Sequence, residues 1–343
     1  SYGLEEAPGF LKAADFKVQM WAPSGQEYNF SDYHGENQNQ PVLFWFAREL
    51  KRGGLALEEV ADLEKIPTAL RASRHLALEL LWWDPALSLE PESPPLHWVA
   101  SGGLPLAVMR SAWNDPRATF AAGKGGTPNQ SHGHMDVGSF ILEARGVRWA
   151  LDLGTESYGK MRAAKLDLWS YAQHSSRWST FRVGPEGHNI LRFNGEEQEV
   201  SGYAKIRDLT PGAGARGVAL DLTPLYRGWA DSVERSIILG RDGIVTIQDG
   251  WKLGPRDATV SFQWLTKAAV LRKGHGFLLN QAGETLELEI EASGIPGLKI
   301  EDVSKARGPQ DSDNPGLRRI SISIFGLSGK AGRLKIRAIP GRI

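Results

Sequence analysis

Cysteine is absent from this chain of 343 residues. Its absence excludes disulfide bonds, thiolate metal sites and cysteine nucleophiles, although it leaves the cellular compartment open. The sequence also lacks any apolar run that approaches the roughly 20 residues of a transmembrane helix, so no membrane span is expected. Lys and Arg together number 40, as do Asp and Glu, so the chain has no overall charge excess that would favour nucleic acid or an anionic membrane as a partner.

The length and the apolar content indicate two domains with large cores. A chain of 343 residues is too long for one typical domain, and 41% of its residues are hydrophobic. Helical periodicity over residues 41–52, 57–66 and 71–83 predicts helices in the first part of the chain. Residues 22–35 are polar and aromatic without a period, which indicates a loop, and residues 87–95 have the Pro, Ser and Glu content of a linker.

From about residue 97 the sequence changes to short alternating runs separated by Gly, Pro, Asn and Asp. Such runs predict an antiparallel β-sandwich rather than alternating strands and helices. The runs are 106–110, 140–144, 236–239, 243–248, 286–290 and 320–324. We therefore expect an α+β chain with a helical part over residues 1–93 and a sandwich over residues 94–343. Because three or four helices cannot bury both faces of a helical layer, we expect them to be the end of a larger helical domain.

Metal-ligand side chains recur in the first half of the expected sandwich. His132 and His134, two of only eight histidines, lie beside an apparent strand. Side chains at i and i+2 of a strand share a face, so both imidazoles are expected at one site. Asp152 ends one strand-like run and His188 opens another, and a histidine, an aspartate and a second histidine form a candidate zinc set. The alternative is that the histidines are hydrogen-bonded core residues and that Asp152 caps a turn.

Several motifs follow one another in a specific order along the chain. They are residues 28–32, 108–113, 124–126, 131–140 and 146–154, then Tyr158, then residues 188–198. In this order they resemble the heparinase II/III-like family of polysaccharide lyases. The resemblance extends over roughly residues 20–200, and beyond that only the texture of the sequence is similar.

The resemblance implies the C-terminal part of an (α/α) toroid followed by a β-sandwich, and β-elimination on uronic-acid-containing glycans such as alginate or heparan sulfate. It implies one divalent ion, commonly zinc, held by His134, Asp152 and His188, with His132 near the substrate carboxylate. The tyrosine and histidine that the family supplies from earlier toroid helices are not found in this sequence. The expected partners are an acidic polysaccharide or oligosaccharide and either the remaining toroid segment or a second copy of the chain. We also expect a periplasmic or secreted location.

Elimination at a uronic acid needs charge stabilisation, a base and an acid, because removal of the C5 proton builds negative charge on the adjacent carboxylate. We expect His132 to neutralise that charge; the alternative is that it ligates or supports the metal. The resemblance implies a base tyrosine between the metal aspartate and the metal histidine, and the candidates are Tyr171, which we favour, and Tyr158. The alternative is that Tyr171 only packs with Trp169 and Trp178. Tyrosine has an unperturbed pKa of about 10, so a base needs nearby positive charge, which Arg177 or His132 would supply.

Four side chains are predicted to contact the acidic sugar: Arg110, Trp113, Tyr158 and Arg177. Asp32 is interpreted as a helix cap or loop brace. These residues lead to the hypothesis of a zinc-containing polysaccharide lyase. Two alternatives stay open, a carbohydrate-binding fragment without turnover and a zinc-dependent hydrolase. Only elimination produces a conjugated double bond, so ultraviolet absorbance distinguishes the three.

Overall fold

A computed structural model describes residues 3–35, 40–64, 75–91, 93–209, 211–212 and 214–341. The chain forms two compact units, one of residues 1–21 and 36–95 and the other of residues 22–35 and 96–343. The second boundary lies two residues from the expected one at 93/94. The new feature is the segment 22–35, which interrupts the helical unit in sequence and belongs to the sandwich unit.

The helical unit contains α1 (Ala14–Met20), α2 (Val42–Leu50), α3 (Leu57–Glu64) and α4 (Leu76–Trp82). Helix α2 begins after Pro41 and ends at Lys51, which adopts the left-handed conformation that terminates a helix. It buries Leu43, Phe44, Phe46 and Ala47, as its helical periodicity predicts. Residues 65–66 and 71–74 of the other two predicted helices lie outside the described residues. None of the described helices has the length and apolar content to cross a membrane.

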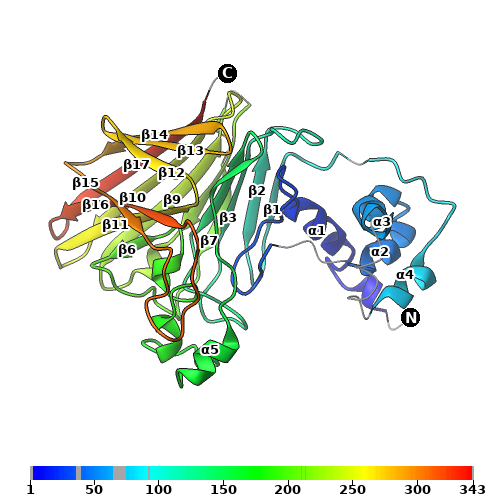
Figure 1. Cartoon of the computed structure of the whole chain (residues 1–343), viewed down its shortest axis with the longest axis horizontal. Helices are drawn as coiled ribbons and strands as arrows, with labels where there is room; N and C mark the ends of the chain where they lie inside the picture. Colours follow the sequence, from blue (N-terminus) through cyan, green and yellow to red (C-terminus); the bar gives the residue numbers. More distant parts are fainter. Residues whose placement is uncertain are drawn as a thin grey trace. The chain divides into compact units, whose positions relative to one another are not determined.

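The sandwich unit is built from three antiparallel sheets (Figure 1). A five-stranded sheet has the order β1-β2-β3-β4-β5, an eight-stranded sheet the order β12-β13-β14-β17-β10-β9-β8-β7, and a four-stranded sheet the order β15-β16-β11-β6. The strands are β1 (His97–Ala100), β2 (Leu106–Arg110), β3 (Phe120–Lys124), β4 (Phe140–Ala144), β5 (Val147–Ala150), β6 (Leu191–Phe193), β7 (Lys205–Leu209), β8 (Arg216–Asp221), β9 (Ala230–Leu239), β10 (Val245–Leu253), β11 (Ala258–Thr266), β12 (Ala269–Lys273), β13 (Gly276–Gln281), β14 (Glu284–Ala292), β15 (Gly297–Asp302), β16 (Arg318–Gly326) and β17 (Ala331–Pro340). The predicted fold class, a few helices followed by a large antiparallel sandwich, is confirmed.

One hydrophobic core joins the three sheets, because buried side chains from each of them form a single cluster. The burial of β10 alternates along the strand, as expected for a strand with one face on the core. Strand β3 packs closely against β9, where a Cβ atom on Gly123 would lie 2.7 Å from Ile237. A side chain at position 123 would therefore displace the end of the Ile237 side chain.

The segment 22–35 is attached to the hairpin of β4 and β5. The backbone N–H and the hydroxyl of Ser24 donate to Glu143 at 3.0 and 2.8 Å. Arg148 donates to the carbonyl of Glu27 at 2.9 Å and to the side-chain oxygen of Asn29 at 3.1 Å. These buried contacts bring Asp32, three residues beyond Asn29, onto the sandwich.

Candidate active site

The two histidines of the Ser131–His134 motif lie on a turn, so the prediction that strand alternation brings them together was wrong. Residues 131–139 contain no strand, and His132 has a φ of 58° in the left-handed region. Gly133 between them lies against the chain, since a Cβ there would be 2.5 Å from the carbonyl oxygen of Pro128. The turn exposes the His132 ring and buries the His134 ring completely.

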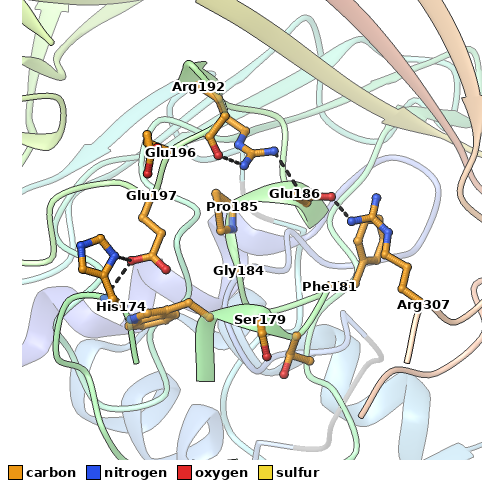
Figure 2. A pocket seen from close by; sticks show the side chains of 13 residues that line it. His174, Ser179, Phe181, Gly184, Pro185, Glu186, Arg192, Glu196, Glu197 and Arg307 are labelled. Atoms are coloured by element: carbon orange, nitrogen blue, oxygen red, sulfur yellow. Dashed lines mark hydrogen bonds and ion pairs between the residues drawn. The ribbon is translucent and has the colours of Figure 1, made fainter. Parts of the chain in front are cut away.

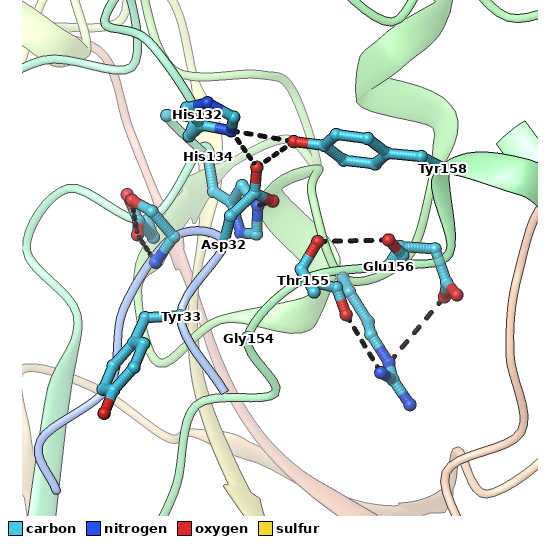
Figure 3. A network of polar contacts seen from close by, with 12 residues as sticks. Asp32, Tyr33, His132, His134, Gly154, Thr155, Glu156 and Tyr158 are labelled. Carbon is cyan, nitrogen blue, oxygen red and sulfur yellow. Dashed lines mark hydrogen bonds and ion pairs between the residues drawn. The ribbon is translucent and has the colours of Figure 1, made fainter. Parts of the chain in front are cut away.

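Asp32 joins the two histidines and Tyr158 (Figure 3). One carboxylate oxygen, Oδ2, lies 2.7 Å from Nδ1 of His132 and accepts the hydroxyl of Tyr158. The other, Oδ1, lies 3.0 Å from Nε2 of His134. Burial raises the pKa of Asp32, but the hydrogen bonds from His134, Tyr158 and His132 outweigh it and hold that pKa well below its ordinary value. Asp32 is therefore an ionised carboxylate that orients both imidazoles.

His134 and His188 share a buried arrangement in which each ring has one carboxylate partner. Nε2 of His134 faces Asp32 at 3.0 Å, and Nδ1 of His188 faces Asp152 at 2.9 Å. The opposite ring nitrogens, Nδ1 of His134 and Nε2 of His188, are buried and have no hydrogen-bond partner. The ring centroids are 5.4 Å apart. Burial lowers the pKa of His134, which favours the neutral imidazole that binds metals.

Asp136 completes a cluster that fits a divalent ion. Ligand atoms of His134, Asp136 and His188 lie within 4.8 Å of one another, and all three residues are buried. Two imidazole nitrogens and a carboxylate oxygen form a donor set that suits zinc. The two unpartnered ring nitrogens support this fit, because buried polar atoms without a partner are rare and costly.

His134 and His188 lie together, as expected. Asp152, the predicted third ligand, instead contacts Nδ1 of His188. Among the described residues, the set with mutually close ligand atoms contains Asp136, and Asp152 contacts His188 through Nδ1. A carboxylate that binds the far nitrogen of a metal-binding imidazole fixes its tautomer and orientation. The His-x-His-x-Asp spacing of residues 132–136 was the available sequence signal for Asp136.

Lys124, the first residue of the 124–126 motif, forms a buried ion pair with Asp136. Both side chains are fully buried. The N–H and hydroxyl of Ser31 also donate to Asp136 at 3.1 and 3.2 Å. Burial raises the pKa of Asp136, but the positive charges of Lys124 and the histidines outweigh burial and hold that pKa below its ordinary value. This carboxylate is therefore ionised. The Lys124 ammonium is not available to a ligand at the surface.

Tyr171 and Arg177 hydrogen-bond to the backbone of the turn that carries His132 and His134. The hydroxyl oxygen of Tyr171 accepts the backbone N–H of His132 at 2.9 Å. The fully buried guanidinium of Arg177 donates to the carbonyls of Leu168 at 2.6 Å and Gly133 at 3.0 Å, and it lies 5.0 Å from the Tyr171 ring centre. Arg177 is thus placed to brace the turn, whereas the sequence had suggested a contact with substrate.

Tyr158 lies in the predicted site beside His132 and is partly exposed to solvent. Its ring stacks on the His132 ring with an interplanar angle of 7° and a centroid separation of 6.4 Å. Burial raises the pKa of its hydroxyl well above the ordinary value, and the charge of Asp32 raises it further. Tyr158 is therefore a neutral phenol that can donate a proton or hydrogen bond.

Arg110 and Trp113 lie apart from the histidines. Arg110 is opposite Phe120 at one end of β3, while Lys124 at the other end contacts Asp136. Four residues of strand separate these points by about 13 Å. The Arg110 guanidinium lies 3.5 Å from the Trp113 ring centre and is nearly buried, and burial lowers its pKa to about 9.

A polar cavity of about 260 Å³ lies beside the turn-bracing residues (Figure 2). Trp178 lines it and packs against Tyr171 at a centroid separation of 6.1 Å. His174 and Glu197 contact each other on one side, and Glu186 contacts Arg307 on another. The cavity therefore adjoins Tyr171 through Trp178.

Comparison with known proteins gives a family match for the sequence. Residues 91–287 match the family model described as heparinase II/III-like, C-terminal. No curated protein sequence matches the chain.

Solved structures share the fold across nearly the whole chain. A heparinase III gene product is 16% identical with a TM-score of 0.64, covering 98% of this chain and 47% of its own. Heparan sulfate lyase HepC from Pedobacter heparinus is 13% identical with a TM-score of 0.63, covering 96% and 46%. A further heparinase III structure is 14% identical with a TM-score of 0.67, covering 97% and 49%. The chain thus spans about half the length of these structures.

Proposed function

The chain belongs to the heparinase II/III-like family, and from this premise we propose that it is the sandwich-bearing part of a polysaccharide lyase acting on uronic-acid-containing glycans by β-elimination. The observation that carries the proposal is the network in which Asp32 orients a half-exposed His132 and a neutral Tyr158 beside the buried imidazole pair. The substrate class is supported by the structural relatives, one of which is a heparan sulfate lyase.

In the proposed reaction a base removes the C5 proton of the uronate, the C4–O bond breaks, and a C4–C5 double bond forms. The leaving oxygen takes a proton. His132 hydrogen-bonds to Asp32 through Nδ1, which leaves Nε2 to face the substrate carboxylate. A histidine held against an ionised carboxylate can donate a hydrogen bond to the enolate-like anion and stabilise it.

The two tyrosines are proposed to take opposite roles. The hydroxyl oxygen of Tyr171 accepts the backbone N–H of His132 at 2.9 Å, which holds it beside His132, and it is the proposed base. Burial and Asp32 raise the pKa of Tyr158, which keeps this phenol protonated, and it is the proposed proton donor to the leaving oxygen. If Tyr171→Phe retains normal turnover, the base assignment is wrong.

We propose that His134 and His188, with Asp136 or Asp152, hold one zinc ion. When bound, the ion would supply positive charge and rigidity to the turn that carries His132. The proposed zinc site would position the turn, since it links the turn at His134 to His188, which lies just before β6. Further proposals are a periplasmic or secreted location and a partner that is either a further helical segment or a second copy of the chain.

The experiment is a screen of the full-length protein against alginate, heparan sulfate and related uronate polymers, read by ultraviolet absorbance of the unsaturated product. We expect absorbance to rise with at least one polymer. New reducing ends without absorbance would indicate a hydrolase, and glycan binding without cleavage would indicate a carbohydrate-binding fragment.

A further inference from the structure

Trp169 is the most exposed of the twelve tryptophans. It is 52% exposed, followed by Trp83 in the helical unit at 40%, whereas Trp149 and Trp264 are fully buried in the sandwich. An isolated exposed apolar side chain is common and needs no explanation. What distinguishes Trp169 is its surroundings.

The indole of Trp169 contacts both exposed groups of the Asp32 network. Its ring centre lies 5.8 Å from that of His132 and 5.4 Å from that of Tyr158, at an interplanar angle of 87° in each case. Because the imidazole and phenol rings are themselves nearly parallel, the three rings form one aromatic surface. More than half of the Trp169 residue remains open to solvent on that surface.

The backbone beneath Trp169 is fixed. The preceding residue, Leu168, is buried in a cluster with Met135 and Trp178, and its carbonyl accepts a hydrogen bond from Arg177 at 2.6 Å. The N–H of Asp167 donates to the hydroxyl of Ser176 at 2.9 Å. The ring is therefore presented from an anchored loop, which lowers the entropic cost of ordering it against a ligand.

We propose that Trp169 is the stacking platform of a saccharide subsite adjacent to the reacting uronate. Pyranose rings carry C–H groups on their faces, and such a face stacks on an indole without needing charge. The neighbouring sugar would place its carboxylate at His132. This inference rests on the proposed lyase function for the identity of the adjacent sugar, but the stacking itself does not need turnover.

The test compares Trp169→Ala and Trp169→Phe with Phe325→Ala in the full-length protein. Phe325 is a matched control, since it is an aromatic residue, 66% exposed, on β16. Two probes are used: the polymer that is cleaved, and carboxyl-reduced tetrasaccharides of heparan sulfate and alginate, which keep the pyranose faces but cannot undergo elimination.

We expect Trp169→Ala to raise KM by about tenfold with kcat changed by less than about twofold, as loss of uniform binding predicts. Its affinity for a carboxyl-reduced tetrasaccharide, measured by calorimetry, should fall by a similar factor, with Trp169→Phe intermediate and Phe325→Ala unchanged. If no polymer is cleaved but tetrasaccharide binding still falls in Trp169→Ala, the inference stands and the lyase proposal fails.

Three results overturn the inference. One is unchanged KM and unchanged tetrasaccharide affinity in Trp169→Ala. Another is a lower melting temperature or altered subunit association with unchanged affinity, which would mean that the indole packs against protein. The third is the absence of measurable tetrasaccharide binding by the wild-type protein.

Discussion

Two buried polar networks in the sandwich unit differ in one respect. Arg235 and Asp249 form an ion pair with two contacts of 2.7 and 2.9 Å, and the remaining Arg235 donors reach the carbonyls of Gly138 and Asn189. Neither side chain has a buried atom without a partner, whereas the His134–His188 pair leaves two ring nitrogens unpartnered. A saturated network stabilises the fold alone, and an unsaturated one retains capacity for a ligand.

Breaking the saturated network should have the largest effect on stability. Asp249→Ala leaves the fully buried Arg235 guanidinium without its counter-charge, so we expect a loss of about 3–5 kcal/mol in the free energy of unfolding. Urea denaturation measures it. A loss below about 1 kcal/mol would show that Arg235 is compensated in another way.

At the unsaturated site, His132→Ala should act on turnover without affecting the fold. We expect turnover to fall by about 10²–10⁴-fold, with zinc content and unfolding free energy essentially unchanged, because the ring is half-exposed. His174→Ala is the matched control, since His174 is also exposed, has a φ of 58° and contacts a carboxylate. Loss of zinc in His132→Ala would instead make His132 a metal ligand.

Removing the metal should show how much bound zinc adds to the free energy of unfolding. At free ion of 10²–10³ times Kd, we expect bound zinc to stabilise the protein by about 3–4 kcal/mol. A chelator should therefore lower the melting temperature of the wild-type protein but not that of His188→Ala. Equal melting temperatures of the wild-type protein with and without chelator would contradict the metal site.

The two carboxylates near the imidazoles should differ in their effect on zinc affinity. Asp152 binds the far nitrogen of His188, so Asp152→Asn should weaken zinc binding by about 10–100-fold. Asp136→Asn should weaken zinc binding more strongly, because Asp136 lies in one cluster of close ligand atoms with both imidazoles. Competition titrations with a zinc indicator measure both. The reverse order would identify Asp152 as the ligand, as the resemblance implies.

The partly exposed network of Glu301, Arg319 and Lys299 should have the smallest effect on stability, and that effect should depend on pH. Burial raises the pKa of Glu301, but hydrogen bonds from Arg319 and Lys299 outweigh it and lower that pKa to about 2 from 4.5. A depressed folded-state pKa stabilises the fold above the unfolded value, and this stabilisation is lost as pH falls from about 4.5 to 2. Glu301→Gln should cost about 1 kcal/mol at pH 7 and almost nothing at pH 2, as measured by denaturation across that range. A pH-independent difference would argue against the ion pair.

The sequence predicted the sandwich because alternating apolar and polar residues are a local signal. Strands β2 and β4 coincide with the predicted alternating runs. The role of Asp32 could not be read locally, because it lies 100 residues from His132 and reaches it only when the segment 22–35 docks on the sandwich. The positive charge of Arg177 suggested contact with an acidic substrate. The side chain is instead fully buried, and its burial could not be predicted from the sequence.

The most direct test of the central claim is anomalous diffraction at the zinc edge from crystals of the full-length protein. The account predicts a single peak between Nδ1 of His134 and Nε2 of His188, within coordination distance of a carboxylate oxygen. Crystals grown with zinc that show both rings in place and no anomalous peak between them would contradict it.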